Sequence, residues 1–209
     1  MSYRVAVLVS GEGSNLQAIL DKLHGRDGIE VIGVASNRPD ARGLGRAQRA
    51  EVETSVFDAG DFGGDRVIRD RLLGDWLEER SPDLIVLAGF MEILSPEFMR
   101  RFQGKVVNVH PSLLPAFRGI HAIEKALDYG VRVTGVTVHF VDEGVDSGPI
   151  ILQQALELPY SAGLEAIEES VHAIEHELLP RAIRLLASGA VRIDPDNPRR
   201  VLIEERADV

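Results

Sequence analysis

The feature that most limits the fold of this chain is an almost unbroken apolar run at residues 4–10, which passes directly into the glycine-rich stretch Gly11-Glu12-Gly13-Ser14-Asn15. Apolar runs of this kind are typical of parallel strands that are buried on both faces. Apolar residues at helical spacing follow between Leu16 and Leu23. The order of strand, glycine-rich turn and helix predicts an α/β chain.

Strand and helix patterns alternate along most of the remaining sequence. Strands are predicted at residues 30–36, 53–57, 84–88, 106–110, 133–140 and 150–158, the last antiparallel to the one before it, and a hairpin at 191–193 and 201–203. Helices are predicted at residues 44–50, 65–80, 121–129 and 164–187, the last interrupted by Pro180, with a short helix after Ser95-Pro96. In the helix at 65–80, the stripe predicted to face the core consists of Val67, Ile68, Leu72, Leu73, Trp76 and Leu77. We predict an α/β fold with a doubly wound, Rossmann-like, mostly parallel sheet and antiparallel C-terminal strands.

Composition and charge narrow the class of protein. The chain has 209 residues, no cysteine and a formal net charge of -10. The missing cysteines exclude disulfides and fit a reducing compartment, and the acidic balance makes nucleic acid and anionic membranes poor partners. No apolar run is long enough to span a membrane, and the start of the chain does not resemble a signal peptide. We therefore expect one cytoplasmic domain over residues 1–209, with a short C-terminal appendage from about residue 190.

The glycine-rich turn has the composition of an anion site. Backbone N–H groups and the dipole of the following helix can face a phosphate there, and Ser14 and Asn15 are expected as capping side chains that could also donate to it. A dinucleotide fingerprint would need glycine at Leu16 and an acidic residue after the second strand, and a P-loop would need Gly-Lys-Ser/Thr; neither is present. A phosphomonoester site and a plain N-capped turn both remain compatible with the pattern.

Asn108 and His110 stand at the end of a predicted buried strand, directly before two closely spaced prolines, Pro111 and Pro115. Residues i and i+2 of a strand share a face, so an amide and an imidazole can converge on one target. Such a pair suits acyl chemistry, in which an oxyanion forms and a proton moves. The alternative is a structural histidine, but the prolines and the expected exposed loop position favour a functional one.

Three carboxylates lie in the later turn at residues 141–149, namely Asp142, Glu143 and Asp146. Their spacing lacks the pattern of a calcium loop and no pair of histidines accompanies it, so no metal is predicted. A carboxylate beside His110 would raise the pKa of the imidazole, fix its tautomer and hold a proton ready for donation. Asp146 is the expected partner.

Four motifs together resemble the glycinamide ribonucleotide formyltransferases over nearly the whole chain. They are Ser10-Gly11-Glu12-Gly13-Ser14-Asn15-Leu16, Leu87-Ala88-Gly89-Phe90-Met91, residues 108–115, and Asp146-Ser147-Gly148-Pro149. The resemblance implies transfer of the formyl group of 10-formyltetrahydrofolate, a co-substrate, to 5′-phosphoribosylglycinamide in purine biosynthesis. It implies the formyltransferase fold, no metal, small-molecule partners and an assembly compatible with a homodimer. It also implies a cis peptide bond between Leu114 and Pro115.

The resemblance assigns roles to individual positions. The catalytic residues would be Asn108, His110 and Asp146, with His139 in support. The substrate would be bound by Gly13, Ser14, Asn15 and Glu175, although pattern alone makes Glu175 and His176 ordinary helix-flank residues. The folate would be bound by Arg66, Met91, Glu92, Ile93, Leu94, Asn108, Val141, Asp142 and Asp146. Glu92 departs from the family, in which its position is commonly basic, and Arg66 is expected either to be solvated or to bind a ligand carboxylate.

Three rival functions remain open from the sequence. Formyltetrahydrofolate deformylases are similar but usually carry a regulatory domain and a second histidine where Pro111 stands. Methionyl-tRNA formyltransferases share the central string yet lack the glycine-rich start and add an RNA-binding domain. A catalytically idle phosphate-binding module would share the scaffold, but the presence of Asn108, His110 and Asp146 together argues against it.

Overall fold

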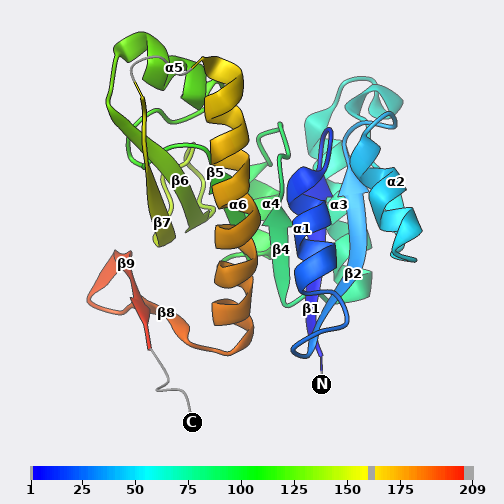
Figure 1. Cartoon of the computed structure of the whole chain (residues 1–209). Coiled ribbons are helices and arrows are strands. Elements are labelled where there is room, and N and C mark those ends of the chain that lie inside the picture. The colour runs from blue at the N-terminus through cyan, green and yellow to red at the C-terminus, as the bar shows by residue number, and fades with distance from the viewer. Residues whose placement is uncertain (1, 160–162, 205–209) are drawn as a thin grey trace. The chain divides into compact units, whose positions relative to one another are not determined.

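The computed structural model describes residues 2–159 and 163–204 of the chain (Figure 1). It divides into two compact units whose boundary falls between Asn108 and Val109, and each unit is described by itself. The predicted fold class is confirmed, with a parallel, doubly wound arrangement in the first unit and antiparallel strands in the C-terminal part. Most of the predicted elements are present, with ends that differ by about two residues.

The first unit is built on parallel strands in the order β3-β2-β1-β4-β5. These strands are β1 (Tyr3–Val9), β2 (Ile29–Ser36), β3 (Thr54–Val56), β4 (Leu84–Leu87) and β5 (Val106–His110), which ends just beyond the boundary. Val7 of the central strand lies opposite Val34 on one side and Val86 on the other. The side chains of residues 5–9 in β1 are fully buried, as the sequence predicts for a strand covered on both faces. The strand order reverses between β1 and β4, so the carboxyl ends of these strands form the edge where ligands bind in such sheets.

The strands of the first unit are connected by helices. These helices are α1 (Ser14–Lys22), α2 (Arg42–Arg49), α3 (Arg66–Arg80) and α4 (Pro96–Arg101), with a 3-10 turn at Ala59–Phe62. Helix α1 contacts α2, and α3 contacts α4. This pairing is expected because right-handed crossovers in opposite directions place the two sets of helices on opposite faces of the sheet. Ser95 caps α4, as predicted, by accepting a hydrogen bond from the Phe98 N–H at 3.3 Å.

The buried side of α3 differs from the predicted stripe. Val67 is 56% exposed and Ile68 is 37% exposed, whereas Arg69 and Asp70 are buried. The charged residues are buried as a pair: the Arg69 Nε donates to Asp70 Oδ1 at 2.8 Å, and Asp70 Oδ2 accepts from the Ser95 N–H at 2.6 Å. Hydrophobic spacing could not reveal this pair, since buried charges depend on partners far away in the sequence.

The second unit contains α5 (Ala122–Tyr129), β6 (Val133–Phe140), β7 (Ile150–Glu157), α6 (Leu164–Ala187), β8 (Val191–Asp194) and β9 (Asn197–Ile203). Strands β6 and β7 pair in antiparallel fashion, and α6 packs against both. The side of α6 that includes Ile167, Val171 and Leu178 is buried. Among the described residues, this helix supplies much of the apolar core of the second unit.

Two details of the C-terminal part differ from the sequence prediction. Helix α6 continues through Pro180, where an interruption was predicted. Pro180 and its neighbours Leu179 and Ile183 are buried, and this packing compensates for the lost backbone hydrogen bond. The hairpin forms as predicted, but β9 already begins at Asn197, within the segment predicted to be a loop.

Candidate functional site

The glycine-rich turn begins α1 with Gly13 as the N-terminal cap, at φ 73°. Ser14 is the first helical residue, so the N-cap position is occupied by Gly13 and not, as predicted, by Ser14 or Asn15. Glycine is required at position 13, because a Cβ there would lie 2.6 Å from the Gly43 Cα. The first N–H groups of α1 have no intrahelical acceptor, and the first turn of the helix contains no acidic residue. Such a helix start suits an anionic ligand.

A second loop lies beside this turn at the carboxyl edge of the sheet. The Ser10 N–H donates to the Gly89 carbonyl at 3.1 Å, and the Met91 N–H donates to the Ser10 Oγ at 2.8 Å. Met91 is 72% exposed and Ile93 is 69% exposed, whereas Leu94 is buried. The loop after β4 therefore presents apolar side chains to solvent next to the glycine-rich turn, which is a surface suited to a ring-shaped ligand.

Glu92, in the same loop, is held by cationic neighbours from α3. Its Oε2 lies 3.4 Å from an Arg69 terminal nitrogen and 3.5 Å from the Arg66 Nε. The Asn37 side chain donates to the other oxygen at 3.5 Å. Arg69 is fully buried, whereas the Arg66 side chain is 63% exposed. The acidic residue at this commonly basic position is thus balanced within the unit, and sequence reasoning missed Arg69 because it lies in a helix interpreted only by its apolar spacing.

Asn108 lies on β5, opposite Leu87 of β4. His110 follows two residues later on the same strand, so the two side chains share a face of the strand. His110 is only 5% exposed, and the prediction that it stands at an exposed loop position is wrong. Because β5 stays regular up to His110, the strand rather than the following loop fixes this imidazole. The Leu114–Pro115 peptide bond is cis, as predicted.

The second unit brings His110, His139 and Asp146 together. The Nδ1 of His110 lies 3.4 Å from Asp146 Oδ2, and the Nε2 of His139 lies 3.7 Å from Asp146 Oδ1. The Gly119 N–H donates to Asp146 Oδ2 at 2.8 Å. His139 lies near the C-terminal end of β6 and is buried, whereas Asp146 lies in the β6–β7 turn with φ 46°. The expected proximity of His110 and Asp146 is observed, with His139 on the other carboxylate oxygen.

The hydrogen-bond geometry determines where protons lie in this cluster. The His110 Nε2 is 2.9 Å from the Phe117 carbonyl, and the His139 Nδ1 is 2.8 Å from the Phe140 carbonyl. Carbonyl oxygens only accept, so each of these nitrogens carries a hydrogen. The remaining nitrogen of each ring faces Asp146 and attracts the carboxylate only when it is protonated. The cluster is therefore arranged to accept a proton on an imidazole.

Burial and charge act in opposite directions on these groups. Burial lowers the pKa of His110 below its usual value and outweighs the Phe117 carbonyl and the Asp146 charge, which both raise it. The carboxylate raises the pKa of His110, as the sequence predicts, but burial, which the sequence did not reveal, sets the net direction. Burial alone would raise the pKa of Asp146, but interactions with His139, the Gly119 N–H and His110 bring it down to about 2. Asp146 consequently remains ionised at neutral pH.

The Asp142 carboxylate, also in the β6–β7 turn, accepts hydrogen bonds from residues of that same turn. Asp142 Oδ1 accepts from the Gly144 N–H at 3.0 Å and from the Ser147 Oγ at 2.6 Å. Gly148 is required, since a Cβ there would lie 1.8 Å from the Phe140 carbonyl oxygen. These contacts shape the turn that presents Asp146. Val141 is half-buried at the end of β6.

Glu175 is not an ordinary flank residue of α6. It is 5% exposed and lies on the same side of the helix as the buried Val171 and Leu178. A carboxylate on an otherwise apolar helix face is costly unless it is paired. Its predicted contact with the substrate stays a prediction. In the described part of the chain, no group of three or more His, Cys, Asp or Glu residues is arranged to hold a metal, and no helix is long and apolar enough to cross a bilayer.

Comparisons with known proteins agree with this arrangement. The family described as "Formyl transferase" matches residues 3–183. The phosphoribosylglycinamide formyltransferase of Haemophilus influenzae is 40% identical over 191 residues, covering 91% of this chain and 90% of that protein. The trifunctional purine biosynthetic protein adenosine-3 of Bos taurus is 46% identical over 191 residues, but this chain spans only 19% of its length. The crystal structure of glycinamide ribonucleotide transformylase 1 from Symbiobacterium toebii matches with a TM-score of 0.92 at 43% identity, covering 98% of this chain and 95% of that one.

Proposed function

The chain belongs to the formyl transferase family, and on that basis we propose that it transfers the formyl group of 10-formyltetrahydrofolate to the amine of 5′-phosphoribosylglycinamide, a step of purine biosynthesis. The observation that carries the proposal is the His110 imidazole held between the Phe117 carbonyl and the Asp146 carboxylate. An imidazole placed in this way can take up a proton when negative charge develops beside it.

Substrate binding is proposed for residues at the carboxyl edge of the first unit and on α6. The phosphate would be bound by the backbone and side chains of Gly13, Ser14 and Asn15, at the start of α1. Glu175 would accept hydrogen bonds from the glycinamide end. The folate would be bound by Arg66, Met91, Glu92, Ile93, Leu94, Asn108, Val141, Asp142 and Asp146. In this set, the exposure of Met91 and Ile93 supports contact with a ring.

The chemistry needs no covalent intermediate with the protein. The amine nitrogen attacks the formyl carbon, and the carbonyl oxygen becomes an oxyanion that accepts a hydrogen bond from the Asn108 amide. It accepts a second from the Nε2–H of protonated His110, which for this step turns from the Phe117 carbonyl to the oxyanion while Nδ1–H faces Asp146. The ionised Asp146 favours the imidazolium, offsetting part of the effect of burial. One proton leaves the attacking amine and one reaches the folate N10 as the carbon–nitrogen bond breaks, directly or through water. The products are tetrahydrofolate and 5′-phosphoribosylglycinamide that carries the formyl group on its amine nitrogen.

Catalytic dependence on His110 can be tested with a matched pair of variants. His110→Asn should lower kcat by about 10²–10⁴-fold, the usual range for losing an acid–base group. His121→Asn is the control, because that side chain is 67% exposed and pairs with Glu124, and asparagine tolerates its positive φ. Near-normal turnover of a folded His110→Asn protein would refute the assignment.

Absorbance assays with one or both substrates separate transfer from its rivals. Formyl transfer requires both the folate and phosphoribosylglycinamide, a deformylase consumes the folate alone, and a binding module consumes neither. Folate consumption at the same rate without the ribonucleotide would replace transfer with hydrolysis as the proposed function.

We also propose the finer features of the protein that follow from its relatives. These are one formyltransferase domain with a C-terminal appendage, action in the cytoplasm on small molecules, and no metal requirement. The lack of cysteine is compatible with a reducing compartment. Sedimentation velocity would distinguish a monomer from the homodimer, and activity that disappears on chelation and returns with a metal would contradict the metal-free mechanism.

A further inference from the structure

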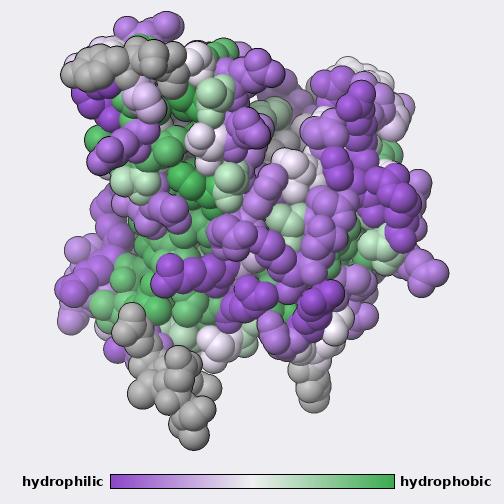
Figure 2. Space-filling view, in the orientation of Figure 1, coloured by the Kyte–Doolittle hydropathy of each residue, from purple (hydrophilic) through white to green (hydrophobic). Residues whose placement is uncertain are grey.

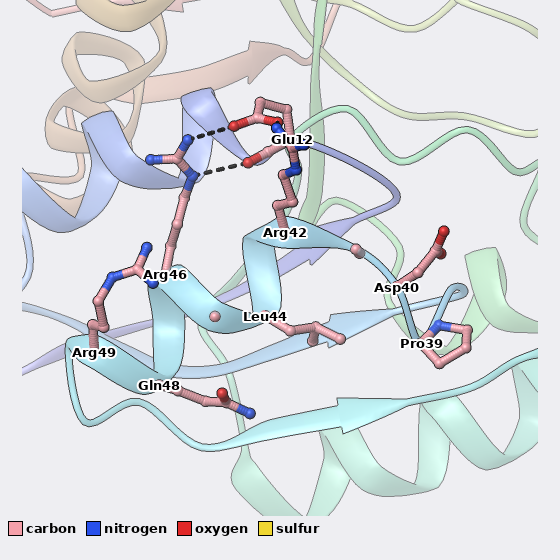
Figure 3. Close-up of a pocket in the computed structure, with 10 residues that line it drawn as sticks. Glu12, Pro39, Asp40, Arg42, Leu44, Arg46, Gln48 and Arg49 are labelled. Carbon is pink, nitrogen blue, oxygen red and sulfur yellow. Dashed lines mark hydrogen bonds and ion pairs between the residues drawn. The ribbon is translucent and has the colours of Figure 1, made fainter.

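Helix α2 packs against the glycine-rich turn and carries three arginines, two of which contact the turn. Arg42, Arg46 and Arg49 line a cavity of about 520 Å³, with Glu12 of the turn on its wall (Figure 3). The surface over α2 is largely hydrophilic (Figure 2). The three arginines differ in what they contact, so their roles can be separated.

Arg46 donates hydrogen bonds to the turn through two of its guanidinium nitrogens and to α1 through the third. Its Nε donates to the Glu12 carbonyl at 2.8 Å, and one terminal nitrogen donates to the Glu12 carboxylate at 2.8 Å (Figure 3). The other terminal nitrogen donates to Gln17 Oε1, on α1, at 3.2 Å. A single side chain, 23% exposed, therefore ties α2 to the backbone of the turn and to the helix that follows it.

The backbones of α2 and the turn also approach closely. The Gly43 N–H donates to the Gly11 carbonyl at 3.0 Å, and the Cα of Gly43 lies only 2.6 Å from the position that a Cβ on Gly13 would take. Two glycines facing each other permit this approach. The carbonyl groups of Gly11 and Glu12 are thus both turned toward α2. A carbonyl oxygen repels an anion, so carbonyls held against α2 would not weaken the binding of a phosphate at the start of α1.

The negative charge of Glu12, in the turn, is balanced by arginines of α2. A carboxylate within a turn that binds phosphate would weaken binding by like-charge repulsion. Hydrogen bonds from Arg46 and Arg42 lower the pKa of Glu12, so the residue is ionised and its charge is balanced by two guanidinium groups. Arg42 reaches only the carboxylate, at 3.0 Å, and its side chain is 79% exposed. Arg46 alone combines charge balance with a hold on the backbone.

We propose that Arg46 is a positioning residue for the phosphate of the substrate. It holds the Glu12 carbonyl and carboxylate against α2, so that the start of α1 can face the ligand. Its three nitrogens are engaged with the turn and Gln17, so it acts through the turn rather than as a direct ligand. This inference rests on the proposed function, since it assumes that residues 13–15 bind the phosphate.

Calorimetric binding of ribose 5-phosphate and of 10-formyltetrahydrofolate, measured separately, tests the proposal. Arg46→Met should weaken ribose 5-phosphate about tenfold, as expected for losing hydrogen bonds made by a charged group, and leave folate affinity unchanged. Arg49→Met, an exposed arginine of the same helix, is the control and should change neither. Unchanged ribose 5-phosphate affinity in Arg46→Met, or an equal loss for both ligands, would overturn the proposal.

Two further variants distinguish positioning from simple charge. Arg46→Lys keeps the charge but not the planar fork, so it should restore little of the lost affinity; full recovery would overturn the positioning role. Adding Glu12→Gln to Arg46→Met should recover part of the affinity, because the unbalanced carboxylate is gone. If Arg46→Met does not fold, Arg46→Lys still decides the question.

The outcome is separate from that of the proposed function. Arg46-dependent binding of ribose 5-phosphate by a chain that transfers no formyl group would leave the inference standing and refute the function. Formyl transfer by a chain in which Arg46→Met binds ribose 5-phosphate normally would do the reverse. Absence of ribose 5-phosphate binding in the unmodified chain would overturn the inference.

Discussion

Replacing Gly13 with alanine should destabilise the glycine-rich turn in two measurable ways. The backbone at Gly13 has φ 73°, and a side chain in the left-handed region costs roughly 1–2 kcal/mol. The new Cβ would also lie 2.6 Å from the Gly43 Cα, which is a backbone atom and cannot simply rotate away. Overpacking of this kind costs about 1–3 kcal/mol. We therefore expect Gly13→Ala to lower the free energy of unfolding by roughly 2–5 kcal/mol.

Gly25→Ala separates the two contributions. Gly25 has almost the same φ, 71°, but a Cβ there would meet no atom within 4 Å, so only the conformational cost of roughly 1–2 kcal/mol applies. Urea unfolding of both variants, followed by circular dichroism, gives the difference directly. Equal losses in the two proteins would refute the close contact between Gly13 and Gly43. A folded Gly13→Ala protein should in addition bind ribose 5-phosphate more weakly, whereas Gly25→Ala should not.

Three other predictions concern charge. The pKa of His110 is lowered in the folded chain, so its stabilising effect is present above the unfolded pKa near 6.5 and is lost as pH falls through the folded pKa. His110→Asn should therefore lose less stability than the parent as the pH falls below about 6.5, and an identical pH slope in the two proteins would contradict this. Asp146→Asn removes the charge that raises the pKa of His110, so proton NMR titration of the ring should give a still lower pKa, with kcat reduced about 10²-fold or more; an unchanged ring pKa would separate the two groups. Arg69→Met leaves the Asp70 carboxylate buried without its partner on α3 and should lower the free energy of unfolding in urea by roughly 3–5 kcal/mol. The control Arg71→Met, at an exposed arginine of the same helix, should lower it by about 0.5 kcal/mol or less. Similar values for the two variants would show that Arg69 is not needed to balance the buried charge.

Most of the fold was predictable because its signals are local. The apolar run at β1, the prolines after β5 and the Ser95 cap each act over a few residues, and each lies where the sequence predicted. The predicted break of α6 at Pro180 was wrong because packing of neighbouring apolar residues outweighs a local preference. The exposed Val67 and Ile68 have a similar origin, since the buried pair on α3 is stabilised by partners from other segments.

The candidate site was only partly predictable. The partnership of His110 with Asp146 followed from residue types and resemblance, and the distance between them agrees. The net direction of the His110 pKa could not be predicted, because it depends on how deeply the ring is buried. The hydrogen bonds from Arg46 to the turn could not be predicted for a different reason. An arginine on a short polar helix has no sequence signal that distinguishes it from solvated neighbours.

The destination of the formyl group tests the central claim most directly. A single-turnover experiment would use 10-formyltetrahydrofolate labelled on the formyl carbon, a saturating amount of 5′-phosphoribosylglycinamide, and the parent chain beside His110→Asn. The account predicts that the label appears on the glycinamide amine with the parent chain, and orders of magnitude more slowly with the variant. Label released as formate, or transferred equally fast by both proteins, would contradict it.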